Sequence, residues 1–452
     1  MQTILSYRSH AVAVLALGLP LAGSHLAGFA IGVIDVIMLG RYGVQELAAV
    51  VLGSSFFVTF LLFGSGFGQA VMPMVARAQS SGDVTQIRRV TRMALWWSVL
   101  FGLAVMPIFL FSGPLLRLAG QDPEIARLAG LYLQIVSLQM FPALGMWVLR
   151  AYLAAMDRSR AVFLFTIAAV ALNAALNYLL IFGAFGFPEL GLAGAAIASV
   201  IVNTLGFVLH AVYAVRTFPE HSLFQRFLKP DPEAFTRVFR IGWPIGVTLL
   251  AEIALFSAAA LLIGAIGTIE LAAHGVALQI ASATFLVHLG LANAATIRAG
   301  QALGREDGAG LLRGALVASV LSMAFVGVAV VLFLAVPEWL MGLFLDPSDP
   351  ATPAVIAVGV SLLAIAALFQ LADAGQVMAV GLLRGLEDTR VPMIYAAISY
   401  WLVGGPAAYL LAFPVGWGPQ GVWLGLTFGL SVAWVLLGGR FWFNKGRLDH
   451  AA

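Results

Sequence analysis

Long apolar stretches recur along this 452-residue chain, and each can cross a bilayer as a helix of about 20 residues. Only 10% of the residues are charged, whereas a soluble domain carries about 25%. The strict polar and apolar alternation of a membrane β-barrel is absent from the sequence. We therefore expect an all-α integral membrane protein with twelve transmembrane helices. The expected spans are 11–40, 47–74, 93–116, 126–149, 161–184, 192–215, 241–267, 271–298, 311–336, 352–383, 391–414 and 419–440.

The basic residues are distributed unevenly between the two sets of connecting segments. Only Arg41, Arg117 and Arg127 fall on one side, and all other lysines and arginines fall on the side that contains the N-terminus. Positively charged loops stay in the cytoplasm, so this asymmetry predicts an even number of spans and two cytoplasmic termini.

The two halves of the sequence resemble each other at a fixed offset of 224 residues, which places Pro20 on Pro244 and Asp83 on Asp307. Two parallel repeats of six helices are typical of secondary transporters, although a duplication without functional consequence would leave the same trace. The expected organisation is an N-terminal six-helix lobe (1–215), a cytoplasmic amphipathic linker (216–240), a C-terminal six-helix lobe (241–440) and a cytoplasmic tail (441–452).

Three acidic residues lie inside apolar spans, where an ionisable group costs roughly 2.5–3.5 kcal/mol or more. They are Asp35, Glu252 and Asp373. Counting from the nearest cytoplasmic arginine, Glu252 and Asp373 both lie about 17 Å into the membrane at 1.5 Å per residue. Two carboxylates at equal depth in one lobe can share a proton or coordinate Na⁺. The alternative is a carboxylate that only fixes helix packing.

Other polar residues and prolines occupy the spans as well. Asn173 and Asn177 are four residues apart, so they share a helix face and can form hydrogen bonds as cavity groups or as links between helices. Gln279, Phe369 and Gln370 are further candidates for a cavity lining. Pro20 and Pro244 interrupt the first and seventh spans and are candidate hinges, although membrane helices also tolerate prolines without a function.

Several classes of protein chemistry have no support in this sequence. Cysteine is absent, which excludes disulfides and a cysteine nucleophile. There is no G-x-x-x-x-G-K-[ST] phosphate loop, no H-E-x-x-H and no G-x-S-x-G motif. We expect no ATP-driven step in this chain, no enzymatic activity, no cofactor and no nucleic-acid partner.

Five segments of the chain together resemble the multidrug and toxic compound extrusion (MATE) family, in its NorM-like branch. They are 18–43, 173–199, 241–274, 290–307 and 373–392. The resemblance implies two six-helix bundles around a V-shaped cavity, with alternating access driven by H⁺ or Na⁺. It also implies a monomer in the cytoplasmic (inner) membrane of a bacterium.

The resemblance also implies roles for individual residues. The family's cation site in the C-terminal lobe maps onto Glu252 and Asp373, where Na⁺ is a candidate ligand, and a protonatable aspartate of the first helix maps onto Asp35. NorM-type proteins often carry a tyrosine four residues before the second acid, where this chain has Phe369. The eighth span of NorM-type proteins often contains the pair His-Gln, whereas His274 in the corresponding span here is followed by glycine.

These observations predict an antiporter that exports organic, mainly cationic and amphipathic compounds in exchange for H⁺ or Na⁺. Its partners would be those small molecules and the membrane lipid. The nearest alternative is a flippase for lipid-linked oligosaccharides, which needs a basic cavity, whereas the midplane groups here are acidic. A membrane-embedded enzyme is the second alternative, but the two acids occur in no known protease motif.

Overall fold

The computed structural model describes residues 6–443, and within that range every regular element is helical. Twelve helices or helix combinations in this range are long and apolar enough to cross a membrane, which confirms the predicted number. The helices are α1 (Tyr7–Tyr42), α2 (Val44–Ser80), α3 (Val84–Leu110), α4 (Ser112–Leu118), α5 (Pro123–Val136), α6 (Met140–Ala155), α7 (Ser159–Phe182), α8 (Gly191–Thr217), α9 (Pro232–Gly264), α10 (Thr268–Gly304), α11 (Gly308–Ala335), α12 (Pro337–Gly342), α13 (Thr352–Gly385), α14 (Arg390–Ala397), α15 (Gly405–Ala412) and α16 (Gly418–Phe443).

The third predicted span, 93–116, differs from the structure at both ends. The helix begins earlier, at Val84, where Asp83 accepts a 2.9 Å hydrogen bond from the backbone N–H of Gln86 and so caps it. It ends at Leu110, and the short α4 follows. Pro114 has no N–H to donate to the carbonyl of Leu110, so an unbroken helix would lose a bond at this point.

The internal repeat is visible in local geometry as well as in sequence. Gly43 and Gly267 precede α2 and α10 in the same extended conformation, and each N–H closes a turn on the preceding helix. Asp307 caps α11 through a 2.7 Å bond from Gly310, as Asp83 caps α3. Equivalent turns and caps at positions 224 apart confirm the repeat.

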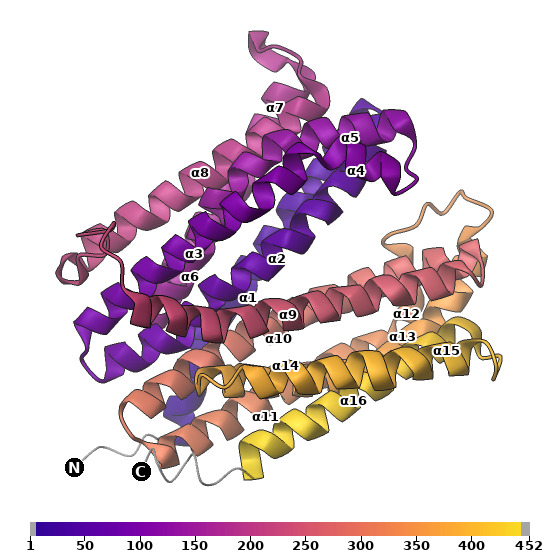
Figure 1. The fold of residues 1–452 in the computed structure, drawn as a ribbon. Helices are drawn as coiled ribbons and strands as arrows, with labels where there is room; N and C mark the ends of the chain where they lie inside the picture. The colour runs from indigo at the N-terminus through magenta and orange to yellow at the C-terminus, as the bar shows by residue number, and fades with distance from the viewer. Residues whose placement is uncertain (1–5, 444–452) are drawn as a thin grey trace. The chain divides into compact units, whose positions relative to one another are not determined.

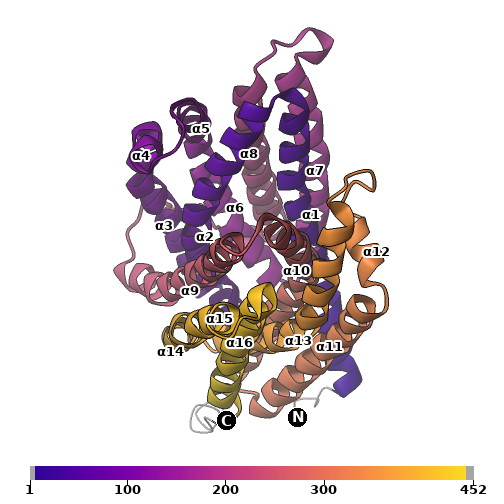
Figure 2. The ribbon, with the colours of Figure 1, turned by 90° about the vertical axis from the view of Figure 1, so that its right-hand side faces the viewer.

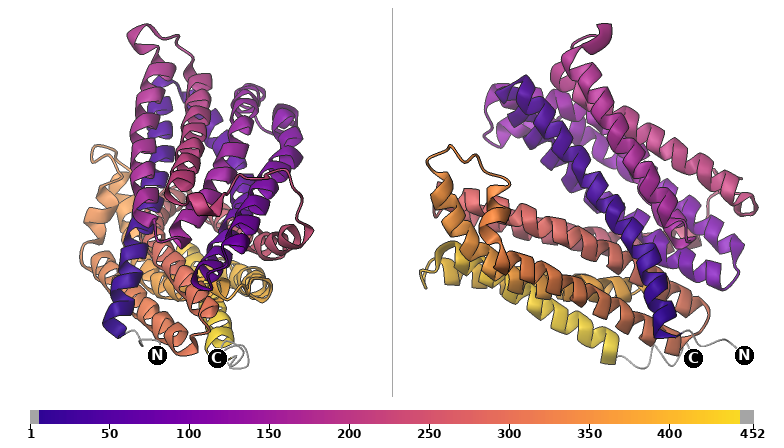
Figure 3. Two further views of the ribbon diagram at one scale, coloured as in Figure 1. Left: turned by 90° about the vertical axis from the view of Figure 1, so that its left-hand side faces the viewer. Right: turned by 180° about the vertical axis from the view of Figure 1, so that it is seen from behind.

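The described helices form two compact units, and the division falls inside α1 and inside α9. Of the described residues, unit 1 contains 6–22 and 247–443, and unit 2 contains Gly23–Gly246. Figure 3 (right) shows α1 as one unbroken helix, although its residues belong to both units. The first turns of α1 therefore pack with C-terminal helices.

The ends of the helices show which residues of the predicted linker and tail are helical. Of the predicted linker 216–240, residues 232–240 are already helical in α9, and only the stretch 218–231 lies between the long helices. Of the predicted tail 441–452, residues 441–443 belong to α16 and 444–452 lie outside the described residues.

Unit 2 is built around α2, which packs against α3, α5 and α6, while α7 packs against α8 (Figure 1). Its core is apolar and aromatic: Phe109 is fully buried and contacts the rings of Phe56, Phe57 and Phe60. Unit 1 is built around α13, which packs against α10, α11 and α16 (Figure 2). Each unit therefore has one central helix that is buried by several others.

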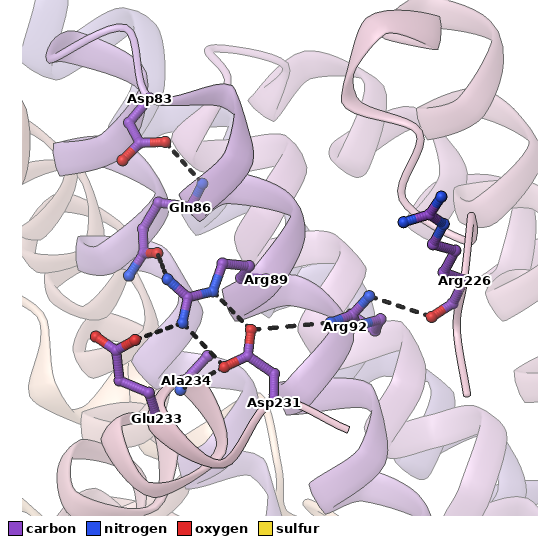
Figure 4. Close-up of polar contacts among 8 residues, drawn as sticks. All are labelled: Asp83, Gln86, Arg89, Arg92, Arg226, Asp231, Glu233 and Ala234. Atoms are coloured by element: carbon purple, nitrogen blue, oxygen red, sulfur yellow. Dashed lines mark hydrogen bonds and ion pairs between the residues drawn. The ribbon is translucent and has the colours of Figure 1, made fainter. Parts of the chain in front are cut away.

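The stretch after α8 is held against α3 by a group of charged residues (Figure 4). The guanidinium of Arg89 donates two bonds to Asp231, of 2.6 and 2.9 Å, and one of 2.6 Å to Glu233. Arg92 donates to the carbonyl of Arg226 at 3.1 Å. We call Arg89, Arg92, Asp231 and Glu233 the linker clamp. These hydrogen bonds from Arg89 are the main cause that lowers the pKa of the Asp231 carboxyl, while partial burial opposes the shift.

Aromatic side chains extend the linker clamp into the membrane-spanning region of unit 2. The indole of Trp97 donates to the carbonyl of Phe235 at 3.0 Å and stacks on its ring at 4.3 Å. The ring of Phe239 also stacks on Trp97, and it stacks on Phe67 of α2. The start of α9, up to Gly246, is thereby fixed to unit 2.

Candidate functional site

Asp373 occupies the buried face of α13, and only 2% of its surface is exposed. Phe369, Gln376 and Asp373 lie four or three residues apart, so they share one face of the helix. The Asp373 carboxylate interacts electrostatically with the half-buried Glu252 of α9, which in turn interacts with Arg384 of α13. One oxygen of Asp373, Oδ1, is buried without a hydrogen-bond partner in the structure. The structure thus brings together the two acids that the sequence predicted for one site.

A tyrosine that sequence reasoning did not select completes this group. Tyr400 is fully buried, and its hydroxyl accepts a 2.8 Å hydrogen bond from Nε2 of Gln376. It interacts electrostatically with both Glu252 and Asp373. Phe369 lacks the hydroxyl that a tyrosine would carry at its position. Tyr400, from another helical segment, supplies a hydroxyl near the same two carboxylates.

Tyr400 reaches this position from a π-helical segment, Ile398–Gly404, between α14 and α15. The N–H of Gly405 donates to the carbonyl of Tyr400, five residues earlier, and the following Pro406 has no N–H to continue an α-helical pattern. Trp401 donates to the carbonyl of Ala251 at 3.2 Å and so attaches the segment to α9 beside Glu252. The signal in the sequence was the Gly-Gly-Pro run at 404–406, since π-bulges frequently occur at functional sites.

An aromatic cluster borders the two acids. Phe369 contacts Phe256 and Trp423 edge to face, with ring centroids 6.1 and 5.4 Å apart. Trp423 is fully buried and donates its indole N–H to Nδ1 of His274 at 3.1 Å. Nε2 of that histidine is buried without a hydrogen-bond partner. Phe369 and Trp423 are buried, whereas Phe256 is half-buried, and its exposed ring surface is suited to contact with an organic cation.

The two predicted glutamines differ in their surroundings. Gln370 is fully buried on α13, and its Nε2 donates to the carbonyl of Ala281 at 3.2 Å while its Oε1 has no partner. Gln279 lies half-buried on α10. A role in lining a substrate cavity stays a prediction for both side chains.

Unit 2 contains a second polar group in its membrane-spanning helices. Nδ2 of Asn177 on α7 donates to the carboxylate of Asp35 on α1 at 2.5 Å and to Oδ1 of Asn173 at 3.3 Å. Both asparagines are fully buried, whereas Asp35 is half-buried. The structure therefore brings together three predicted residues that lie on two helices.

Pro20 and Pro244 lie inside α1 and α9. The division between the two units falls two residues after each of them, at 22/23 and 246/247. The prolines are thus the repeat-related positions nearest to the points where each helix passes from one unit to the other.

No group of three or more histidine, aspartate or glutamate side chains that could hold a metal ion gathers among residues 6–443. Any ion at Glu252 and Asp373 would need further oxygens, such as the hydroxyl of Tyr400 and the amide oxygen of Gln376. Oε1 of Gln376 is buried and has no hydrogen-bond partner. The donors present are hard oxygen ligands, which suit Na⁺ or a proton better than a soft metal.

The MatE family model matches the chain twice, over residues 20–179 and 244–410. The two matches begin at Pro20 and Pro244, which supports the 224-residue repeat. A "Probable multidrug resistance protein NorM" from Rhizobium meliloti (strain 1021) is 47% identical over 99% of this chain and 96% of its own length. A protein of the same name from Agrobacterium fabrum is 44% identical over 96% of this chain and 94% of its own length.

Solved structures share the fold at low sequence identity. A MATE crystallised in complex with MaL6 has a TM-score of 0.88 at 20% identity and covers 98% of this chain and 97% of its own. A eukaryotic MATE transporter has a TM-score of 0.85 at 21% identity and covers 98% of both chains. With the two family matches and the full-length relatives, these findings show that the chain belongs to the MatE family and is a multi-pass membrane transporter of the multidrug and toxic compound extrusion type.

Proposed function

We propose that this transporter is a multidrug antiporter that exports organic, mainly cationic and amphipathic compounds in exchange for H⁺ or Na⁺. The observation that carries the proposal is the pair Glu252 and Asp373, whose carboxylates interact with each other inside membrane-spanning helices. Full-length relatives that carry the name of multidrug resistance proteins support the substrate class.

The coupling follows from the electrostatics of this pair. Two ionised carboxylates repel each other, so one cation or proton bound between them lowers the free energy of the site. A cationic drug and the coupling ion then compete for the same negative charge, and binding of either one weakens binding of the other. The bordering ring of Phe256, which packs on Phe369, would favour an organic cation over a hydrated one.

Asp35, Asn173 and Asn177 form the second polar group that we assign to cation coupling and substrate contact. Asp35 can exchange a proton because its carboxylate is only half-buried, while Asn177 holds one of its oxygens at 2.5 Å. Gln279 and Gln370 are proposed as polar contacts for substrate in unit 1.

Pro20 and Pro244 are proposed as hinges. Each lies inside a helix that belongs to both units, so a bend there would change the direction of one half of the helix while both units keep their internal packing. We further propose that the protein is a monomer in the bacterial inner membrane with both termini in the cytoplasm, in accordance with the positive-inside rule.

The proposal is tested with purified protein in liposomes loaded with ethidium. A pH gradient and a Na⁺ gradient are imposed separately, and efflux is followed by fluorescence. Glu252→Gln and Asp373→Asn should each abolish efflux, whereas Glu338→Gln, at an exposed glutamate of α12, should leave it unchanged. Efflux under one gradient identifies the coupling ion. If neither gradient drives efflux, or if both site variants transport normally, the antiport mechanism is wrong.

A further inference from the structure

A groove of about 520 Å³ runs between α11, α13 and α16 in unit 1. Most of its described lining is apolar, and its polar groups are the hydroxyl of Ser319 and the indole N–H groups of Trp434 and Trp442. α13 packs against both α11 and α16 (Figure 2). Four residues of α13 line the groove, which are Gly375, Met378, Ala379 and Leu382. Small residues keep the groove open, since Gly375 and Ala379 line it from α13 and Gly438 lines it from α16.

The groove extends along α13 and α16 through most of the depth of one bilayer leaflet. Trp442 lines it one residue before the end of α16, and Gly375 lines it ten residues before the end of α13. At 1.5 Å per residue the groove extends about 10 Å along α13, from Gly375 to Leu382, and about 12 Å along α16, from Trp434 to Trp442. One leaflet, half of the ~30 Å hydrocarbon thickness, is about 15 Å deep. Trp434 and Trp442 are more than one-third exposed along its edge. Most of one acyl chain of a leaflet therefore fits the groove in length and in polarity.

A small basic pocket adjoins the groove at Leu382, which lines both spaces. The polar side chains of this pocket are His10, Arg298 and Arg305, and its volume of about 10 Å³ offers room for a single oxygen atom. Arg313 lies close enough to His10 to interact with it electrostatically. The nearby acid, Asp307, is engaged by the backbone N–H of Gly310 at 2.7 Å.

His10 gives this pocket a hydrogen-bond donor. The ring is 2% exposed, and its Nδ1 lies 3.3 Å from Nη2 of Arg298. A guanidinium can only donate, so Nδ1 must accept and the ring proton must reside on Nε2. This Nε2 is buried without a hydrogen-bond partner in the structure. An N–H surrounded by arginines is a binding group for an anionic oxygen.

We propose that the groove and the basic pocket together bind one anionic phospholipid of the leaflet at this end of unit 1. One acyl chain lies along α13 between Met323 and Trp434, and a phosphate oxygen enters the pocket and accepts from Nε2 of His10. Basic pockets between membrane helices bind anionic headgroups by the same electrostatics. The site is separate from the transport groups Glu252 and Asp373 and does not depend on their role.

Native mass spectrometry of the delipidated full-length protein, with phosphatidylglycerol and phosphatidylcholine offered in competition, tests this proposal. We expect wild-type protein to retain one phosphatidylglycerol with at least tenfold preference. Gly438→Leu should lose this lipid at least tenfold because its side chain fills the groove, and the change fits the fold, since a Cβ at Gly438 has no neighbour closer than 3.8 Å. The matched control is Gly327→Leu, where a Cβ meets nothing within 4 Å and the site is untouched.

Arg305→Gln provides an independent test of the headgroup contact, and it should reduce the preference for phosphatidylglycerol several-fold without reducing retention of phosphatidylcholine. Equal binding of both lipids by wild-type protein would remove the anionic headgroup from the proposal. Equal lipid retention by Gly438→Leu and Gly327→Leu would place the lipid elsewhere. If ethidium displaces the lipid from wild-type protein and its binding is lost in Gly438→Leu, the groove is a substrate path and the lipid assignment is wrong.

Discussion

Gln376 and Tyr400 lie on different membrane-spanning segments, and their side chains meet in a 2.8 Å hydrogen bond in which the amide donates to the phenol. This bond fixes the π-helical segment of Tyr400 against α13, one helical turn from Asp373. The ring of Tyr400 therefore has little freedom to leave the two carboxylates, and its hydroxyl is positioned for a cation that they share.

Replacement of Tyr400 by phenylalanine tests the importance of that hydroxyl. Tyr400→Phe removes the acceptor for Gln376, so we expect a loss of stability on the order of 1 kcal/mol, as for other hydrogen bonds between membrane helices. If the hydroxyl is a ligand, the concentration of coupling ion for half-maximal efflux should also rise. The control is Tyr409→Phe, at a half-exposed tyrosine of α15. An unchanged ion dependence would reduce Tyr400 to a packing residue.

The polar group of Asp35, Asn173 and Asn177 in unit 2 predicts an effect on the pH dependence of efflux. Asn177→Ala removes the 2.5 Å donor of Asp35, so we expect efflux to fall and its pH dependence to shift, while the protein still inserts into the membrane. Asn203→Ala is a suitable comparison, because Asn203 donates to Gln139 at 2.8 Å on other helices of the same unit. Identical pH profiles for both variants would argue against a role of Asp35 in proton coupling.

Removing the proline of α9 should separate stability from transport. Pro244→Ala supplies the missing N–H for the helix, so we expect a higher free energy of unfolding, by up to about 3 kcal/mol, and slower efflux. Pro107→Ala is the matched control, because Pro107 lies inside α3 and within a single unit. Thermal unfolding in detergent and initial rates in liposomes measure the two effects. Undiminished efflux by the more stable variant would exclude a hinge at this proline.

The linker clamp predicts a dependence of stability on pH. The pKa of Asp231 is lower in the folded protein than the value of about 3.9 in an unfolded chain, so the folded state binds fewer protons. The stabilisation, about 1–2 kcal/mol for a partly exposed charged pair, is therefore complete above pH ~4 and is lost as the pH falls through the folded pKa. The Tm of Asp231→Asn should be lower than that of wild-type protein at pH 7, and the difference should shrink below pH ~4.

An exposed ion pair provides the comparison for the clamp. Arg127 and Glu124 form a 2.6 Å pair in which both side chains are about half-exposed. A double-mutant cycle on that pair should show no measurable coupling, whereas a cycle on Arg89 and Asp231 should show a clear one. Equal coupling energies in the two cycles would mean that the clamp does not stabilise the linker.

The number of spans and the repeat could be predicted from sequence because both depend on residue type and spacing alone. The pairing of Glu252 with Asp373 could also be predicted, since equal depth in one lobe limits where two carboxylates can lie. Tyr400 could not be found in this way. Its position depends on a π-helical segment and on how that segment crosses α13, and neither is encoded by periodicity.

The break between α3 and α4 was missed for a related reason. Hydropathy is continuous through residues 93–116, so a window average does not register the lost hydrogen bond at Pro114. The packing of the first part of α1 with unit 1 has no signal in the sequence, because a repeat by itself predicts two self-contained halves. Contacts between residues that are hundreds of positions apart decide that question.

The contact between His10 and Arg298 joins residues that are 288 positions apart. At a synthesis rate of about 5–20 residues per second, roughly 15–60 s pass between the appearance of the two side chains on the ribosome. During that interval the helices that contact the first turns of α1 in the folded protein have not been synthesised. These turns therefore remain in contact with lipid or with the insertion machinery. Assembly of this protein is therefore completed at its N-terminal turns, and a chain truncated before α10 would leave residues 7–22 of α1 without their partners in unit 1.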